Sequence, residues 1–271
     1  MMELVWFGGA SFAALLAFAG LLHLIGKFSP GLSRFCCAAP GLDAIVFLMV
    51  HGPWVAAGVV AARSEAHHWT AFFGVAVVSQ VLAVLVWGWL HEAAHPEFRK
   101  GPRIVGSLNK RVGRARNHAA VWWTALAAPI FTFVRLGELI VYPPLTWLVR
   151  LPKYRTADWV MVSRQKFTGL IGHDLIWCLY CDWMTGVWSL ASEMLRNVES
   201  FWCPIRFSST AKCDNCTIDF PDVNAGWVAH SHHGGTMAEV AATIEKKYPG
   251  PDGDNSWFGH PVRLTIKGKD V

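Results

Sequence analysis

Five cysteines lie between residues 178 and 216, and their spacing favours chemistry on sulfur. They are Cys178, Cys181, Cys203, Cys213 and Cys216. The first two and the last two form Cys-x-x-Cys units, and two thiolates at that spacing can reach one metal ion at about 2.3 Å from each sulfur. The pattern therefore predicts a thiolate site on these five residues that holds iron, zinc or an iron–sulfur cluster.

The same thiols have two alternative roles. Trp177 precedes the first pair, as in the Trp-Cys-x-x-Cys segment of thiol oxidoreductases, so a redox dithiol is one alternative. Cysteine is also among the most buried residue types, so structural thiols or disulfides are the other. A separate pair, Cys36 and Cys37, adjoins an apolar stretch and is expected to be lipidated or inert.

Histidines indicate a second chemistry. The segment His91-Glu92-Ala93-Ala94-His95 matches the His-Glu-x-x-His pattern, in which two histidines one helical turn apart bind zinc and the glutamate activates water. It also resembles the first histidine box of membrane di-iron desaturases and hydroxylases. That resemblance implies a di-iron cofactor and further ligands from His118 and the His230-x-His232-His233 cluster, with His91, Glu92, His95 and His118 as the catalytic candidates.

Haem is not the expected cofactor. A Cys-x-x-Cys-His attachment motif is missing, because Asp182 and Thr217 follow the two cysteine pairs. Paired histidines could still ligate haem, and the histidines at 23, 91, 95 and 118 are expected near one membrane face, with His51 inside a span.

The elements that position these residues are predicted to be membrane helices. The chain of 271 residues is 53% hydrophobic and 16% charged and contains 15 tryptophans, unlike an ordinary soluble protein. A helix needs roughly 20 apolar residues to cross a bilayer, and the stretches 4–26, 42–62, 70–91 and 119–149 reach that length. Arg135, Glu138 and Pro143-Pro144 interrupt the last stretch, which is either one tilted helix or a re-entrant pair.

This pattern predicts a mainly α-helical, multi-span membrane protein with two domains. Residues 1–150 form the transmembrane domain, and residues 151–271 form a small, irregular, Cys-rich domain. Hydrophobic residues recur at 3- and 4-residue steps from 173 to 202, which predicts a long amphipathic helix with both Cys178 and Cys181 on its charged face. A helix over 236–247 and a strand over 262–266 are expected beyond it.

The distribution of charge indicates the topology. The net charge is +5, and seven cations lie between residues 99 and 116, after the third apolar stretch, where no acid follows Glu97. Such loops stay in the cytoplasm, so the loop is interpreted as a topology signal and not as a nucleic-acid site. A single fourth crossing would place the C-terminal region outside, whereas the cations from Lys153 to Lys166 and the closely spaced cysteines favour the cytoplasm.

One resemblance covers about 30 of the 271 residues. The segments Cys178-Leu179-Tyr180-Cys181 and Trp202-Cys203-Pro204-Ile205-Arg206, with Gly186-Val187 and the stripe Glu193, Arg196 and Glu199 between them, resemble a bacterial group of uncharacterised proteins with a CLYC segment followed by a WCPI(K/R) segment. The resemblance implies that the three cysteines and the charged stripe act together. In this interpretation the stripe supplies charge around the cofactor.

The predicted function is that of a membrane-anchored thiolate metal or iron–sulfur protein with a redox or electron-transfer role, in the bacterial inner membrane. Its expected partners are membrane lipids, other membrane-protein subunits and a redox partner, and no nucleic acid. Two alternatives remain: the di-iron oxygenase or desaturase, and a non-catalytic accessory subunit whose tryptophans pack against other proteins.

Overall fold

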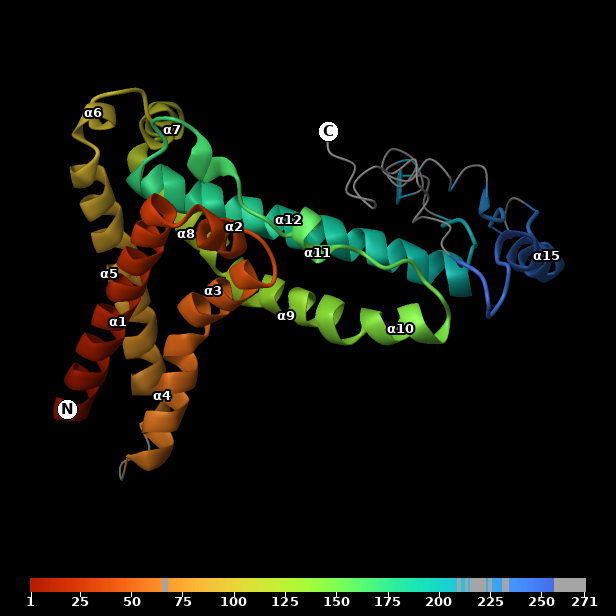
Figure 1. The fold of residues 1–271 in the computed structure, drawn as a ribbon, viewed down its shortest axis with the longest axis horizontal. Helices are drawn as coiled ribbons and strands as arrows, with labels where there is room; N and C mark the ends of the chain where they lie inside the picture. Colours follow the sequence, from red (N-terminus) through yellow and green to blue (C-terminus); the bar gives the residue numbers. More distant parts are fainter. Residues whose placement is uncertain are drawn as a thin grey trace. The chain divides into compact units, whose positions relative to one another are not determined.

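The computed structural model describes residues 1–64, 68–208, 211–212, 214, 223, 226–230 and 234–255. The described chain is mainly helical (Figure 1) and contains two isolated β-bridges in place of a sheet. Its contacts form two compact units, one of residues Met1–Thr132 and Val160–Gly186 and the other of Phe133–Trp159 and Val187–Val271. This division differs from the predicted boundary at residue 150, because the segment after residue 159 packs on the N-terminal helices.

Long apolar helices dominate the first unit. Helices α1 (Met2–Phe28) and α5 (Trp69–Ala94) are each long and apolar enough to cross a membrane. Helices α3 (Gly41–Val50) and α4 (Gly52–Arg63) meet that condition as a pair bent by 47°. The stretch Arg114–Leu148 also meets it. The prediction of a mainly helical chain is therefore confirmed, and three or four stretches of its described residues are long and apolar enough to cross a membrane.

Small side chains let these helices approach closely. Ala57, Ala61 and Ala76 are fully buried around the edge-to-face pair of Phe7 and Phe72. A side chain at Gly8 of α1 would meet Val75 of α5, and the hydroxyl of Ser79 donates to the carbonyl of Gly8 at 3.1 Å. Small residues at helix contacts are the usual means of association in lipid, where apolar burial gives little driving force.

The bend between α3 and α4 follows from Pro53. Proline has no N–H to donate to the carbonyl four residues earlier, which here belongs to Met49. The side-chain amide of Gln80 on α5 replaces that donor, bonding the carbonyls of Met49 and Val50 at 2.8 Å each. Trp54 donates in turn to the Gln80 oxygen at 2.8 Å. A neighbouring helix therefore satisfies the backbone at the break, as a bilayer requires.

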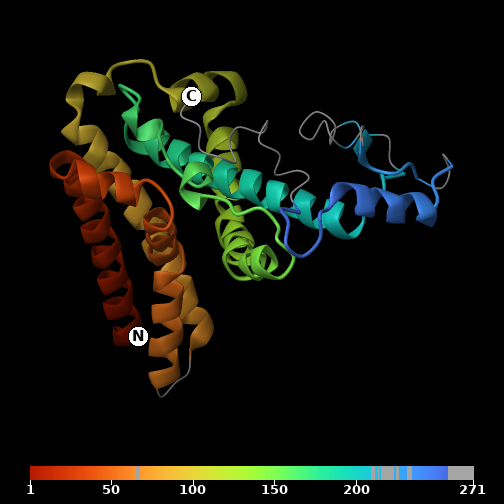
Figure 2. The ribbon, with the colours of Figure 1, turned by 45° about the vertical axis from the view of Figure 1, so that its right-hand side comes forward.

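Short helices gather at one end of these spans. They are α2 (Pro30–Cys36), α6 (Pro96–Arg99), α7 (Ile104–Val112), α8 (Arg114–Ala125) and the 3-10 turn η1 (Arg164–Lys166). Helix α12 (Gly172–Trp202) begins there, near the C-terminal ends of α1 and α5 (Figures 1 and 2). It starts one residue before the predicted amphipathic helix and ends at the predicted residue.

The buried face of α12 differs from the one expected from hydrophobicity. Trp183, Val187 and Leu190 are buried as predicted for apolar residues, but Trp188 and Leu195 are more than half exposed. Several polar side chains of its second half are buried instead: Glu193, Asn197 and Ser200. Hydrophobic periodicity predicts a helix with two faces, but it does not tell whether the apolar face packs on protein or on lipid.

The second unit contains most of α9 (Ala127–Ile140), α10 (Tyr142–Leu148), α11 (Thr156–Trp159), the later part of α12, and α15 (Met237–Lys247). Its core includes Val223, Trp227 and Tyr248. The predicted helix over 236–247 is confirmed, and a capping box between Thr236 and Glu239 begins it. The predicted strand over 262–266 lies outside the described residues.

A separate Cys-rich domain finds no support in the described part of the chain. Cys178 and Cys181 belong to α12 and to the first unit, and Cys203 belongs to the second. Cys213 and Cys216 lie outside the described residues.

Candidate functional site

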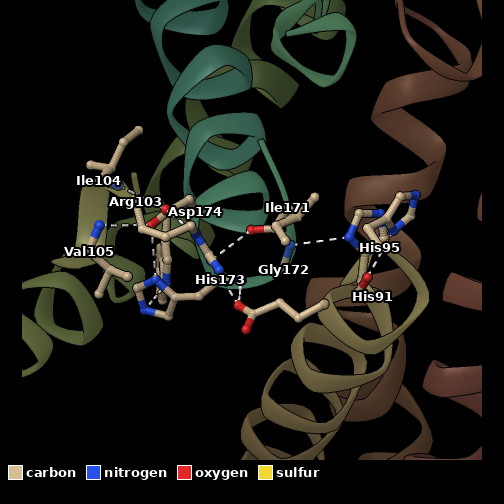
Figure 3. A network of polar contacts seen from close by, with 11 residues as sticks. His91, His95, Arg103, Ile104, Val105, Ile171, Gly172, His173 and Asp174 are labelled. Carbon is tan, nitrogen blue, oxygen red and sulfur yellow. Dashed lines mark hydrogen bonds and ion pairs between the residues drawn. The ribbon is translucent and has the colours of Figure 1, made fainter. Parts of the chain in front are cut away.

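A polar network ties together three elements of the first unit (Figure 3). It joins the C-terminal end of α5, the N-terminus of α7 and the N-terminus of α12. Arg103, which precedes α7, donates to Asp174 of α12 at 3.0 Å and to Glu92 of α5 at 2.8 Å. It also donates to the Ile171 carbonyl at 3.0 Å. One guanidinium thereby links segments about 80 residues apart in the sequence.

Asp174 accepts hydrogen bonds through both carboxylate oxygens. Oδ2 accepts from Arg103 Nε and from the Ile104 amide, and Oδ1 accepts from the Val105 amide, all at 3.0 Å. It therefore caps α7 from a distant part of the chain, where the orphan N–H groups favour negative charge. Burial opposes ionisation, but the nearby His173 side chain and hydrogen bonds from Arg103 and Val105 outweigh it and hold the Asp174 pKa below its usual value.

The side chain of His91 connects α5 to the backbone of α12. The Gly172 amide donates to His91 Nδ1 at 3.2 Å. A backbone N–H can only donate, so Nδ1 must carry the lone pair and the ring proton lies on Nε2. In this conformation the Nδ1 lone pair of His91 is engaged by a hydrogen bond, and the predicted histidine box stays a prediction.

The histidine rings in this region form two groups. His23 of α1 lies edge-on to His91 and His95, which stack on each other with centroids 4.4 Å apart. His95 Nδ1 is 2.9 Å from the His91 carbonyl, so Nε2 is its free nitrogen. His118 instead lies edge-on to His173, at 5.2 Å between centroids. Of the four histidines expected at one membrane face, His23, His91 and His95 therefore lie together. The fourth, His118, contacts α12.

The thiols of Cys178 and Cys181 lie one turn apart on α12. Cys181 is exposed and Cys178 is half-buried. Arg164 of η1 lies beside the two thiols and interacts electrostatically with both. Burial raises the pKa of the Cys178 thiol, and the nearby Arg164 offsets only part of this rise. Cys178 is therefore a protonated thiol near neutral pH.

The loop that carries Arg164 also contacts the first cysteine pair. The side-chain amide of Gln165 lies 3.1 Å from Cys37 Sγ. The Val162 amide donates to the Cys37 carbonyl at 2.8 Å, and the Ser163 amide donates to Asp182 of α12 at 2.8 Å. Two adjacent residues of one loop therefore lie beside two cysteine pairs that are far apart in the sequence.

The remaining predicted site residues belong to the second unit or lie outside the described residues. Glu193, Arg196, Glu199 and Cys203 belong to the second unit, where Glu193 is buried and Arg196 pairs with Glu199. His230 also belongs to that unit, and His232 and His233 lie outside the described residues. Within the described ranges, no group of three or more histidine, cysteine, aspartate or glutamate side chains is arranged to hold a metal ion.

The sequence interpretation missed Arg103, Asp174 and Arg164 as site residues. In the sequence Arg103 is only one of the seven cations of the basic loop. One signal was present: a carboxylate at the first turn of an otherwise apolar helix start needs a partner when it is buried. Which cation supplies that partner depends on chain folding over 71 residues.

Comparison of the chain with protein-family models, with curated proteins and with solved structures found no match.

Proposed function

We propose that this protein is a membrane-anchored redox protein whose reacting groups are the thiols of Cys178 and Cys181. The observation that carries the proposal is the position of Arg164, a cation beside both thiols, on a loop whose next residue contacts Cys37. Two sulfurs are enough for a two-electron dithiol–disulfide couple, which needs no third ligand. The metal site predicted from the cysteine spacing needs more ligands than the described residues bring together.

The two thiols differ in a way that suits thiol–disulfide exchange. Cys181 is exposed beside Arg164, so it is the attacking group, while Cys178 is more buried and burial raises its thiol pKa. The Cys181 thiolate attacks a disulfide of a partner protein, forming a mixed disulfide and releasing one partner thiolate. The deprotonated Cys178 then attacks the Cys181 sulfur and releases the second. Two electrons pass to the partner, and each thiol of the pair loses one proton.

The helix makes this disulfide reversible. Side chains three residues apart on a helix have Cβ atoms about 5–6 Å apart, whereas a relaxed disulfide has them about 3.5–4.5 Å apart. Closing the bond therefore distorts the first turns of α12. Strained and exposed disulfides are more easily reduced than structural ones, as a redox couple requires.

The proposed location of the pair is the cytoplasmic side of a bacterial inner membrane. Asp174 is bonded to Arg103 and to the start of α7, within the loop that holds seven cations. Loops rich in Lys and Arg stay in the cytoplasm. Thiols there remain reduced until a partner oxidises them.

Redox equilibration of the purified full-length protein tests the dithiol. After incubation in defined dithiothreitol mixtures, free thiols are alkylated and each cysteine is read by mass spectrometry. We expect a Cys178–Cys181 disulfide that titrates as one two-electron step and vanishes in Cys181→Ser. The matched control is Cys203→Ser, which should titrate as the wild type does. A pair that stays reduced under full oxidation would refute the dithiol couple.

A thiolate-bound metal or iron–sulfur cluster is the second candidate. It is favoured by the second Cys-x-x-Cys unit, Cys213 and Cys216, which lies outside the described residues. Cys178, Cys181 and Cys203 would supply the other ligands, with Glu193, Arg196 and Glu199 nearby in sequence to adjust the charge. Metal and acid-labile sulfide in anaerobically purified protein distinguish the candidates. Stoichiometric metal that is lost in both Cys178→Ala and Cys213→Ala supports the metal site and argues against the dithiol.

A further inference from the structure

Both flanks of the apolar stretch 114–148 are held at the same end of the membrane spans. The chain enters it from α7, whose first amides bond Asp174 beside the end of α5. It returns at Val160, whose carbonyl accepts from Ala39 at 2.9 Å. Ala39 lies between α1 and α3, at the end of α1 where His23 meets His91 and His95. A stretch that leaves and returns on one side crosses the bilayer an even number of times.

The length of the stretch rules out two crossings. It contains 35 residues. Two helical crossings need roughly 40 apolar residues in addition to a turn. The number of complete crossings is therefore zero, even though the stretch is long and apolar enough for one.

Helix α8 runs beside the start of α12 in the same direction. Successive contacts join His118 to His173, Trp122 to Trp177 and, through a 2.9 Å hydrogen bond, Tyr180 to the Thr124 carbonyl. Helix α12 carries carboxylates at 174 and 182 within these turns, and a charge in mid-bilayer costs on the order of 3 kcal/mol on insertion scales. A helix that shares the direction of α12 over several turns shares its position at the membrane surface.

The burial pattern distinguishes two faces of the stretch. Large apolar side chains are exposed at helical spacing along it: Trp123, Leu126, Ile130, Phe133, Ile140 and Trp147. The buried side chains of the same stretch include the polar Asn117 and Thr132 and the ion pair between Arg135 and Glu138, at 2.5 Å. An apolar face opposite a polar one, with tryptophan near both ends, is typical of a helix in the plane of the interface.

We propose that residues 114–148 lie in the membrane interface, with this apolar face in the lipid, and do not cross the bilayer. The partner of the face is the hydrocarbon border of the same leaflet that the ends of α1 and α5 reach. The C-terminal region then remains on the side of the basic loop. This placement does not depend on the thiol chemistry.

Labelling of the full-length chain in sealed vesicles of known orientation tests the topology. Single cysteines replace three exposed residues, His68, Ser107 and Lys153, in a background where all seven native cysteines are serine. A membrane-impermeant maleimide should label Ser107→Cys and Lys153→Cys from the same side and His68→Cys from the other. Lys153→Cys labelled together with His68→Cys would overturn the proposal. A protease site inserted after Lys153 in the wild-type chain repeats the test with the native cysteines present, and cleavage from the side of His68 would again overturn it.

A spin label at Ile140 tests the lipid contact. Ile140 is 66% exposed, so Ile140→Cys accepts the label without repacking. In lipid vesicles we expect it to be more accessible to oxygen than to a water-soluble nickel chelate, and the label at Ser107→Cys to show the reverse order. Equal exposure of both labels to the nickel chelate would place the face in water and contradict the proposal.

Discussion

Replacing Asp174 by asparagine tests whether the polar network at the start of α12 stabilises the first unit. The two side chains have nearly the same shape, but both Asp174 oxygens face only donors. An amide NH₂ in either position would face another donor. Asp182, two turns later on the same helix, is the matched control. Its Oδ2 accepts both amide bonds, from Ser163 and Arg164, and its Oδ1 faces only the Arg164 guanidinium at 3.7 Å.

The expected cost differs several-fold between the two sites. At Asp174 the change leaves one buried donor unsatisfied, which costs about 1–3 kcal/mol, and removes a charge from an ion pair whose side chains are only 13% and 5% exposed. Arg103 keeps Glu92, so the loss stays below the 3–5 kcal/mol of a fully broken buried pair. We expect about 3 kcal/mol for Asp174→Asn. Asp182→Asn keeps both backbone hydrogen bonds and loses only a partly exposed pair, so we expect less than about 1 kcal/mol.

Thermal unfolding in detergent micelles measures the difference. At roughly 2–4 °C per kcal/mol for a chain of this size, Asp174→Asn should lower the midpoint by about 6–12 °C and Asp182→Asn by no more than about 4 °C. Equal midpoints for the two variants would refute the reasoning, because the local sequence context of both aspartates is helical and only the tertiary partners differ.

Three further predictions concern the same region. Folding lowers the Asp174 pKa, so the contribution of Asp174 to stability is present above the unfolded pKa of about 3.9 and is lost as the pH falls through the folded pKa. The unfolding free energy of the wild type should therefore fall more steeply below about pH 4 than that of Asp174→Asn. Parallel plots of unfolding free energy against pH for the two proteins would contradict this. Gly172→Ala should lower the unfolding midpoint more than Gly169→Ala, since both glycines have positive φ but only at Gly172 would a Cβ overlap the Glu92 side chain. In timed alkylation read by mass spectrometry, Cys181 should react before Cys178 at pH 7, and the difference between the two rates should narrow at pH 9. The reason is that the thiolate is the reacting form and burial raises the Cys178 pKa. Equal rates at pH 7 would count against the burial argument.

Much of the secondary structure could be predicted because its causes are local. The apolar stretches 4–26 and 70–91 correspond to α1 and α5, and the 3.6-residue repeat predicted α12 to within one residue. The capping residues Thr236 and Glu239 likewise marked the start of α15. In each case neighbours within a few residues supply the information, whether as hydropathy, as periodicity or as a cap.

Only part of the candidate site could be tested. The sequence correctly placed Cys178 and Cys181 on one helix, whereas their joint site with Cys203, Cys213 and Cys216 stays a prediction. The structure adds Arg164 beside the two thiols and Gln165 beside Cys37, which belongs to the pair expected to be lipidated or inert. Loop contacts of this kind produce no repeating pattern in the sequence, because each involves a single side chain whose partner depends on the tertiary fold.

The sequence by itself therefore determined that the chain is helical, that three or four of its stretches suit a membrane, and that two thiols share one helix face. Only the tertiary structure decided which charged side chains form ion pairs with each other. Hydropathy and helical period are properties of neighbouring residues, whereas the bonds from Arg103 to Glu92 and Asp174 join three separate segments. The same holds for the stretch 114–148: its composition allows a crossing, and the contacts of its flanks with Ala39 and Asp174 support the proposal that it makes none.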